Sequence, residues 1–221
     1  MKKIILAISC IAGLSLSASA QFLRFGVKGG LTGTFSEFQS TSSHENLKNE
    51  LGIGGYVGGQ AEVSFKNKSD KFKMQLEVLG NFNSLRNEIG TMTLMTANSK
   101  MDVYSISVPI LAKYFFQPNF SLYLGPTFNF NLHAKHGMKP QTGNEWVYSN
   151  SDDINKALNP FQVGGMIGAN YYIKKGFYVE ARYQMIMPDV TTNNIAHPSP
   201  EYGAINNISV GVGYKFRNKA K

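Results

Sequence analysis

The segment FYVEARYQM, residues 177–185, shows most clearly the pattern from which the fold follows. One side of this stretch carries Phe177, Val179, Ala181, Tyr183 and Met185, and the other carries Tyr178, Glu180, Arg182 and Gln184. Side chains of a β-strand point alternately to its two faces, so a period of two predicts a strand with one apolar and one polar face.

The same alternation recurs seven more times along the chain. The predicted strands cover residues 23–35, 51–65, 72–83, 101–116, 120–132, 161–171, 177–185 and 208–216. Tight connections at 66–71, 117–119 and 174–176 alternate with long ones at 36–50, 84–100, 133–160 and 188–206. This order predicts an all-β, eight-stranded, antiparallel up-and-down barrel, in which the last strand pairs with the first. Pro109 lacks an N–H, so we expect a bulge or an unpaired position there.

Composition excludes several classes. The 221 residues are 43% hydrophobic and include 22 glycines, so the chain is ordered. The single cysteine excludes an intramolecular disulfide framework, a Cys-rich zinc module and a CxxC redox site. The net charge of +8 suits nucleic acid, an anionic membrane surface or a solubilising excess equally.

Residues 1–20 have the form of a cleaved signal peptide. Lys2 and Lys3 precede an apolar run at 4–16, which ends in Ser17-Ala18-Ser19-Ala20. Lipidation at Cys10 is the alternative, although the residue three positions before it is Ala7 instead of leucine. We therefore expect export and a single barrel domain at 21–221. After Ala20 no apolar stretch is long enough for a transmembrane helix.

Alternation alone fits a lipid-embedded barrel and a soluble lipocalin-like barrel equally well. Two features favour lipid. Aromatic residues flank the short turns and predict a girdle at one membrane interface: Phe65, Phe72, Phe115, Phe116, Phe120, Tyr171, Tyr172, Phe177, Tyr214 and Phe216. The polar face is rich in glycine, which suits a narrow lumen. We therefore predict an integral outer-membrane barrel.

With the apolar face outside, nine charged side chains point into the lumen. They are Arg24, Lys28, Glu62, Lys73, Glu77, Lys113, Glu180, Arg182 and Lys215. The hairpin at 65–72 places Glu62 diagonal to Lys73 and Gln60 opposite Glu77. Six bases against three acids leave three positive charges, for which an ordered anion or water is the hypothesised compensation. An eight-stranded barrel has room only for such side chains, so we expect little or no conductance.

Several stretches resemble one family, the PorT-like outer-membrane β-barrel proteins. Ser107-Val108-Pro109-Ile110-Leu111-Ala112-Lys113-Tyr114-Phe115 is similar to the family strand E-I-P-L-L-x-K-Y, and the next strand has Leu122-Tyr123-Leu124-Gly125-Pro126. The segments 161–169, 180–184 and 26–31 extend the likeness over nearly the whole mature chain. The resemblance implies an outer-membrane location, a barrel of the OmpA/OmpX-like type and, for some members, a link to type IX secretion. Ser107 replaces the usual glutamate, which leaves one lumen base without its usual partner.

The closing segment 209–216 resembles the terminal-strand signal that the outer-membrane assembly machinery reads. Five residues, 217–221, follow it, whereas the signal usually ends on an aromatic residue. We expect the partners to be outer-membrane lipid, this machinery during insertion, and a secretion-system or extracellular protein.

Local motifs for catalysis are absent. His133 and His136 lie near Asp152-Asp153 in sequence, but nothing brings them together as metal ligands, so we predict no metal and no cofactor. There is no GxSxG nucleophile motif, no phosphate loop and no basic helix for nucleic acid. Aromatic residues on the predicted loops are candidates for partner binding or for anchoring at the outer interface: Phe35, Phe38, Trp146, Tyr148 and Tyr202.

The resulting expectation is a non-enzymatic barrel with a plugged polar lumen and a structural or partner-binding role. The most specific form of this hypothesis is an accessory role in type IX secretion. The alternatives are a narrow small-solute pore, an outer-membrane lipid-modifying enzyme and a soluble lipocalin-like binding barrel.

Overall fold

The computed structural model describes residues 22–38, 48–64, 71–90, 96–139, 147–148, 160–174, 176–187 and 202–216. Eight long strands build the barrel: β1 (Phe22–Phe38), β3 (Gly52–Ser64), β4 (Phe72–Gly90), β5 (Thr96–Gln117), β6 (Phe120–Lys139), β8 (Phe161–Lys174), β9 (Phe177–Ile186) and β10 (Tyr202–Lys215). Two short strands, β2 (Lys48–Glu50) and β7 (Val147–Tyr148), are added to them. Among these residues there is no helix of the length and apolarity that crossing a membrane requires.

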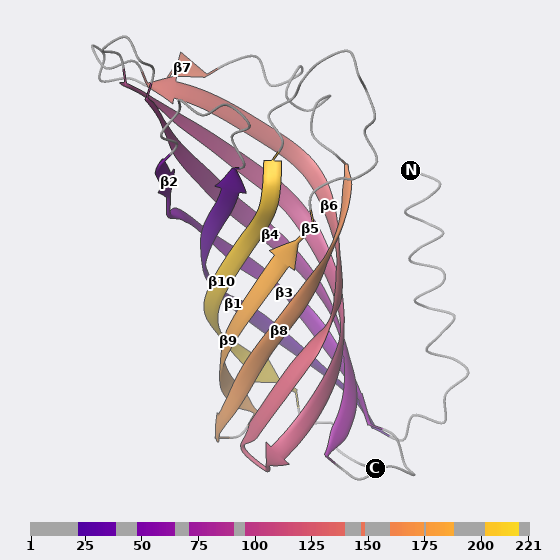
Figure 1. The fold of residues 1–221 in the computed structure, drawn as a ribbon. Helices are drawn as coiled ribbons and strands as arrows, with labels where there is room; N and C mark the ends of the chain where they lie inside the picture. Colours follow the sequence, from indigo (N-terminus) through magenta and orange to yellow (C-terminus); the bar gives the residue numbers. More distant parts are fainter. Residues whose placement is uncertain are drawn as a thin grey trace.

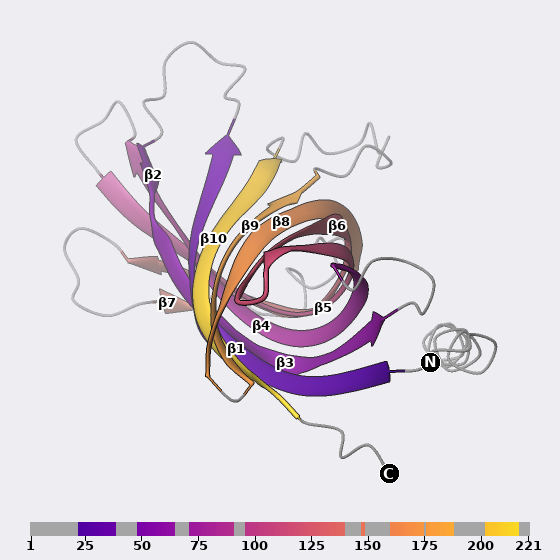
Figure 2. The same ribbon diagram turned by 90° about the horizontal axis from the view of Figure 1, so that it is seen from below.

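The eight long strands form a closed antiparallel ring in chain order, as the view along the axis shows (Figure 2). The ring closes between the first and last strands, where Val27 lies opposite Tyr214 and Leu31 opposite Val210. The predicted up-and-down topology is confirmed. Because closure pairs the first strand with the last, each of the eight described strands has a paired neighbour on both sides over the part of the ring that all of them share.

The polarity of the wall is inverted relative to a soluble protein. Outward side chains such as Leu31, Leu124 and Val212 are exposed by 67%, 62% and 62%. Inward side chains are buried although they are charged, and Glu77 and Lys113 have 0% exposure. The lipocalin-like alternative is therefore wrong, because it requires the apolar face inside.

The strands differ greatly in length, and this is where the prediction was least accurate. β9 has 10 residues, whereas β4, β5 and β6 have 19, 22 and 20. A strand tilted by about 40° advances about 2.5 Å per residue along the axis, so β9 covers about the 25 Å of an apolar band. β4, β5 and β6 extend well beyond the end of β9 (Figure 1).

Much of what was predicted as long loops is therefore strand. Residues 84–90 and 96–100 continue β4 and β5, and residues 133–139 continue β6. β2 pairs with β4 and β7 pairs with β6 in this extension. Outside the bilayer the outward face of a strand meets water instead of lipid, so the apolar period that marks a strand in lipid disappears from the sequence.

The expected irregularity at Pro109 is confirmed. The β4–β5 ladder runs from Leu76–Ile110 directly to Leu79–Ser107, and the two intervening positions are unpaired. On its other side Pro109 keeps its place opposite Thr127 of β6. The register is the same before and after the gap, so an unpaired position and not a bulge accommodates the proline.

Seven of the ten predicted girdle residues lie on the outward face near the short turns. They are Phe72, Phe116, Phe120, Tyr171, Phe177, Tyr214 and Phe216. The rings contact one another, for example Phe177 with Tyr214 at 4.6 Å between centroids. Phe65 lies outside the described residues. The assignment of Phe115 and Tyr172 is wrong, because both rings point into the lumen and stack there at 5.6 Å.

Candidate functional site

The candidate site is the lumen, and tyrosine rings packed over glycines fill its middle. A Cβ atom built on Gly168 would lie 2.4 Å from the ring of Tyr123, and one on Gly213 would lie 2.2 Å from Tyr178. Tyr123 and Tyr178 are each only 1% exposed. The glycines of the polar face therefore make room for large side chains on the neighbouring strands, as the sequence analysis predicted for a narrow lumen.

The central part of the lumen holds an electrically balanced cluster of two acids and two bases. Lys28 of β1 donates to Glu77 of β4 at 2.6 Å and to Glu180 of β9 at 2.8 Å. Arg182 contacts Glu77 at 3.3 Å and also pairs with Glu180. The Tyr56 hydroxyl donates to Glu180 at 2.6 Å, and the Arg182 guanidinium lies 4.2 Å from the Tyr56 ring centroid. We call these four charged residues the central cluster.

A second cluster lies nearer the short turns and carries excess positive charge. Glu62 of β3 pairs with Lys73 at 3.3 Å, with Lys113 at 3.5 Å and with Lys215. Lys113 and Lys215 also donate to the Tyr172 hydroxyl, at 3.1 and 2.6 Å. We call Glu62 and its three lysines the mouth cluster; its formal charge is +2. The predicted diagonal contact between Glu62 and Lys73 is confirmed, as is the pairing of Gln60 with Glu77.

Gln75 joins the two clusters. Its amide nitrogen donates to Glu77 of the central cluster, and its carbonyl oxygen accepts from Lys113 of the mouth cluster at 2.6 Å. Phe115 closes the mouth cluster from one side, with its ring centroid 4.7 Å from the Lys73 amine. Ionic and aromatic side chains thus form one continuous network through the lower half of the lumen.

Eight of the nine predicted lumen charges enter this network, and Arg24 does not. Arg24 lies on the inward face of β1, opposite Glu62, but its side chain is exposed. The strand begins at Phe22, so Arg24 stands at the rim, where solvent reaches it. The predicted excess of three charges therefore becomes two within the network, with a third base at the entrance.

Sequence reasoning missed the tyrosines and the glutamine of the network. Alternation places Tyr178 on the polar face without giving it a role, and it singles out none of Tyr56, Tyr123 and Gln75. A usable signal was present: an aromatic residue on the polar face predicts a glycine beside it on the next strand, because the narrow lumen cannot hold two large side chains at one level.

Farther from the short turns, the lumen is lined by uncharged polar side chains. Gln184 donates to Asn129 at 3.0 Å and to Thr127 at 3.4 Å, and Thr32 and Ser209 share a hydrogen bond of 2.9 Å. At the long-loop side, Lys100 pairs with Asp102 at 3.0 Å.

The predicted loop aromatics lie elsewhere than expected. Phe35 and Phe38 belong to β1, where Phe38 pairs with Tyr202 of β10, and Tyr148 belongs to β7. Phe35 already ends the predicted strand 23–35. For Phe38, Tyr148 and Tyr202 the assignment to loops is wrong, because strands extend farther than the apolar pattern does. Trp146 lies outside the described residues, as do Asp152 and Asp153. His133 lies in β6, with its ring 6.4 Å from that of Tyr104.

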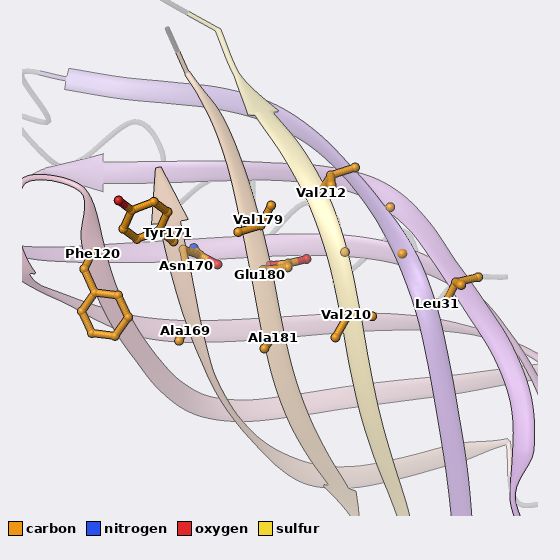
Figure 3. A pocket seen from close by; sticks show the side chains of 13 residues that line it. Leu31, Phe120, Ala169, Asn170, Tyr171, Val179, Glu180, Ala181, Val210 and Val212 are labelled. Carbon is orange, nitrogen blue, oxygen red and sulfur yellow. The ribbon is translucent and has the colours of Figure 1, made fainter. Parts of the chain in front are cut away.

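The outer surface carries a shallow groove of about 600 Å³ across β1, β10, β9 and β8 (Figure 3). Its outward lining is apolar and includes Leu31, Val179, Ala181, Val210 and Val212. In a membrane this face meets the hydrocarbon of lipid chains. The groove therefore belongs to the lipid-facing wall, although Asn170 and Glu180 of the inward face are also among its lining residues.

Comparison with known proteins agrees with this geometry. The family model described as outer membrane protein beta-barrel domain matches residues 17–186. The chain belongs to this family. The family and the barrel together indicate an outer-membrane location. No curated protein matches the sequence.

Solved outer-membrane proteins match the chain at low sequence identity. Neisserial surface protein A is 14% identical with a TM-score of 0.50, and the match covers 87% of this chain and 97% of that one. Ail, the attachment invasion locus protein of Yersinia pestis, is 15% identical with a TM-score of 0.43, over 87% and 98% of the two chains. OprG from Pseudomonas aeruginosa is 11% identical with a TM-score of 0.41, over 88% and 96%.

Proposed function

We propose that this protein is a closed, non-enzymatic outer-membrane barrel that serves a structural or partner-binding role and does not conduct solutes. The observation that carries the proposal is the filled cross-section of the lumen. Lys28 and Glu77 have side chains with 0% exposure, and Tyr123 and Tyr178 are 1% exposed at neighbouring levels. A water-filled path along the axis would expose these groups.

Bilayer recordings test the closed lumen. The purified barrel, inserted into planar bilayers, is expected to give no stable single-channel current. Replacing both Tyr123 and Tyr178 by alanine removes the two largest fully buried lumen side chains, so this variant is expected to leak ions. A current from this variant would show that the assay detects inserted protein. A stable nanosiemens current from the unmodified barrel would favour the pore alternative instead.

The extension formed by β4, β5 and β6 supports a role at the cell surface. It carries strands beyond the band that lipid covers, whereas β9 stops near the edge of that band. Deleting residues 139–155 is expected to leave heat-modifiable folding intact and to abolish recovery of a crosslinked partner. Identical crosslinked partners from both proteins would contradict a binding role for this segment.

In its narrowest form the proposal makes the protein an accessory of type IX secretion, which only the resemblance to PorT-like proteins supports. The test is the amount of type IX cargo outside cells that lack the gene. We expect it to fall and to recover with the intact gene. Unchanged secretion would reject this role and leave the closed barrel standing.

At the outer side of the barrel, the described residues give little support to the enzyme alternative. Asp102 is paired with Lys100 at 3.0 Å, and the His133 ring packs near Tyr104. An acyl-transfer site requires a nucleophile, a base and an acid in mutual contact.

A further inference from the structure

We propose that the short-turn mouth of the lumen is a binding site for a phosphate group. The proposal concerns the mouth cluster and goes beyond the role of the barrel as a closed wall. It rests on charge, on access from one side and on unpartnered polar groups next to the lysines.

Among the residues that the structure describes, the positive charge at the mouth is not balanced by acidic side chains. Lys73, Lys113 and Lys215 converge on one carboxylate, that of Glu62, and their distances to it are 3.5 Å or less. The central cluster contributes no spare acid, because Glu77 and Glu180 are each paired with both Lys28 and Arg182. An uncompensated charge of +2 in a barrel surrounded by hydrocarbon is costly. A phosphate monoester, with a charge of about −1.5 to −2 at neutral pH, matches it.

The mouth is accessible to a ligand from the side of the short turns. The exposed fraction of the side chain falls from 13% at Lys73 to 7% at Lys215 and 0% at Lys113, which orders the lysines from the opening inward. Arg24 stands exposed at the same end, opposite Glu62 in the β1–β3 ladder. A ligand at the opening therefore meets a guanidinium and an ammonium first, the two groups that bind phosphate best.

Buried donors beside the lysines lack partners among the described residues. Both polar atoms of the Gln60 side chain are unsatisfied, and so is the Tyr178 hydroxyl, although the two residues are only 4% and 1% exposed. Gln60 and Lys215 face each other across Gly26, and the Lys215 amine lies 5.9 Å from the Tyr178 ring centroid. Phosphate oxygens, alone or through ordered water, would accept hydrogen bonds from the Gln60 amide nitrogen and the Tyr178 hydroxyl, and ordered water would donate to the Gln60 carbonyl oxygen.

The test replaces sodium chloride by inorganic phosphate at constant ionic strength, with the folded barrel in a phosphorus-free zwitterionic detergent. Binding is followed by the phosphorus NMR signal of the phosphate, and stability by the thermal midpoint of heat modifiability. We expect saturable binding and a raised midpoint. Lys73→Gln and Arg24→Gln each remove one base at the opening and are expected to weaken binding roughly two- to fivefold. Lys73→Arg is expected to retain it, and Lys100→Gln, at the opposite end of the lumen, to leave it unchanged.

A second arm separates the source of the phosphate group. Vesicles of phosphatidylcholine with and without phosphatidic acid, in phosphate-free buffer, present the same group on a lipid headgroup. A response to inorganic phosphate alone assigns the site to a soluble ligand, and a response to phosphatidic acid alone assigns it to lipid. The proposal is overturned if neither arm responds, if chloride acts equally well, or if Lys73→Gln and Arg24→Gln bind like the unmodified barrel. None of these results bears on conductance.

Discussion

Replacing Arg182 by methionine is the sharpest test of the central cluster. Arg182 is 5% exposed, contacts Glu77 at 3.3 Å, pairs with Glu180 and stacks 4.2 Å from the Tyr56 ring centroid. The substitution leaves two buried carboxylates with one base, Lys28. Removing one partner of a buried ion pair costs about 3–5 kcal/mol, because the remaining charge stays buried without compensation.

A compensating substitution separates charge balance from packing. In the double variant Arg182→Met with Glu77→Gln, Lys28 and Glu180 remain as one pair at 2.8 Å, and the cluster is neutral again. We expect this variant to lose only about 1–2 kcal/mol, since neutral replacement of a buried pair is often tolerated. The double variant is thus expected to be more stable than the single one, by about 2 kcal/mol.

The assay is reversible denaturant unfolding of the barrel in lipid vesicles, read by heat modifiability, with the free energy obtained by linear extrapolation. Arg24→Met is the matched control, because Arg24 lies on the same inward face but is exposed, and it is expected to change stability by no more than about 0.5 kcal/mol. The reasoning is refuted if Arg182→Met costs less than about 1 kcal/mol, or if adding Glu77→Gln destabilises the barrel further.

Further predictions concern the packing of the lumen and the lipid-facing wall. Gly168→Val places a Cβ 2.4 Å from the Tyr123 ring and 2.7 Å from the Ala181 carbonyl oxygen, so we expect a loss of at least about 1–3 kcal/mol, whereas Gly165→Ala, with nothing within 4 Å, should be neutral in the same unfolding assay. Leu124→Arg puts a charge about 10 Å above Phe120, near the bilayer centre, and should cost about 2–4 kcal/mol. Leu132 lies about 20 Å farther along the same strand, so Leu132→Arg should lower the free energy of unfolding by less than about 1 kcal/mol. Equal losses for the two variants would contradict this placement of the membrane.

The period of two was sufficient to assign faces and register. It placed Lys28, Glu77 and Glu180 inside, and the hairpin rule gave the Glu62–Lys73 diagonal. Both results follow from local geometry, because the side chains of one strand alternate whatever the rest of the chain does. The prediction that the barrel closes then required only an even number of strands, so that the last strand can pair antiparallel with the first.

The sequence did not predict where each strand leaves the membrane or which residues lie at the rim of the barrel. Arg24 has the correct face for the lumen, yet it lies at the rim, and the end of a barrel is set by where all eight strands stop. Phe115 and Phe116 are adjacent, so alternation requires one ring inside and one outside, and treating both as girdle residues broke that rule. The extensions of β5 and β6 carry no apolar period, because their outward faces lie beyond the hydrocarbon.

The ionic lumen also explains how the chain specifies a single register. An apolar plug would be comparably stable, since well-packed hydrophobic residues often replace buried ion pairs without loss. However, both faces of every strand would then be apolar, and a slip of one residue, which exchanges the two faces, would cost little. With Lys28, Glu77, Glu180 and Arg182 on the inward face, the same slip would place four charges in hydrocarbon, at about 2–4 kcal/mol for each base near the centre of the bilayer. The buried charges therefore act mainly against wrong registers, and the tyrosine–glycine packing fills the space that the correct register leaves.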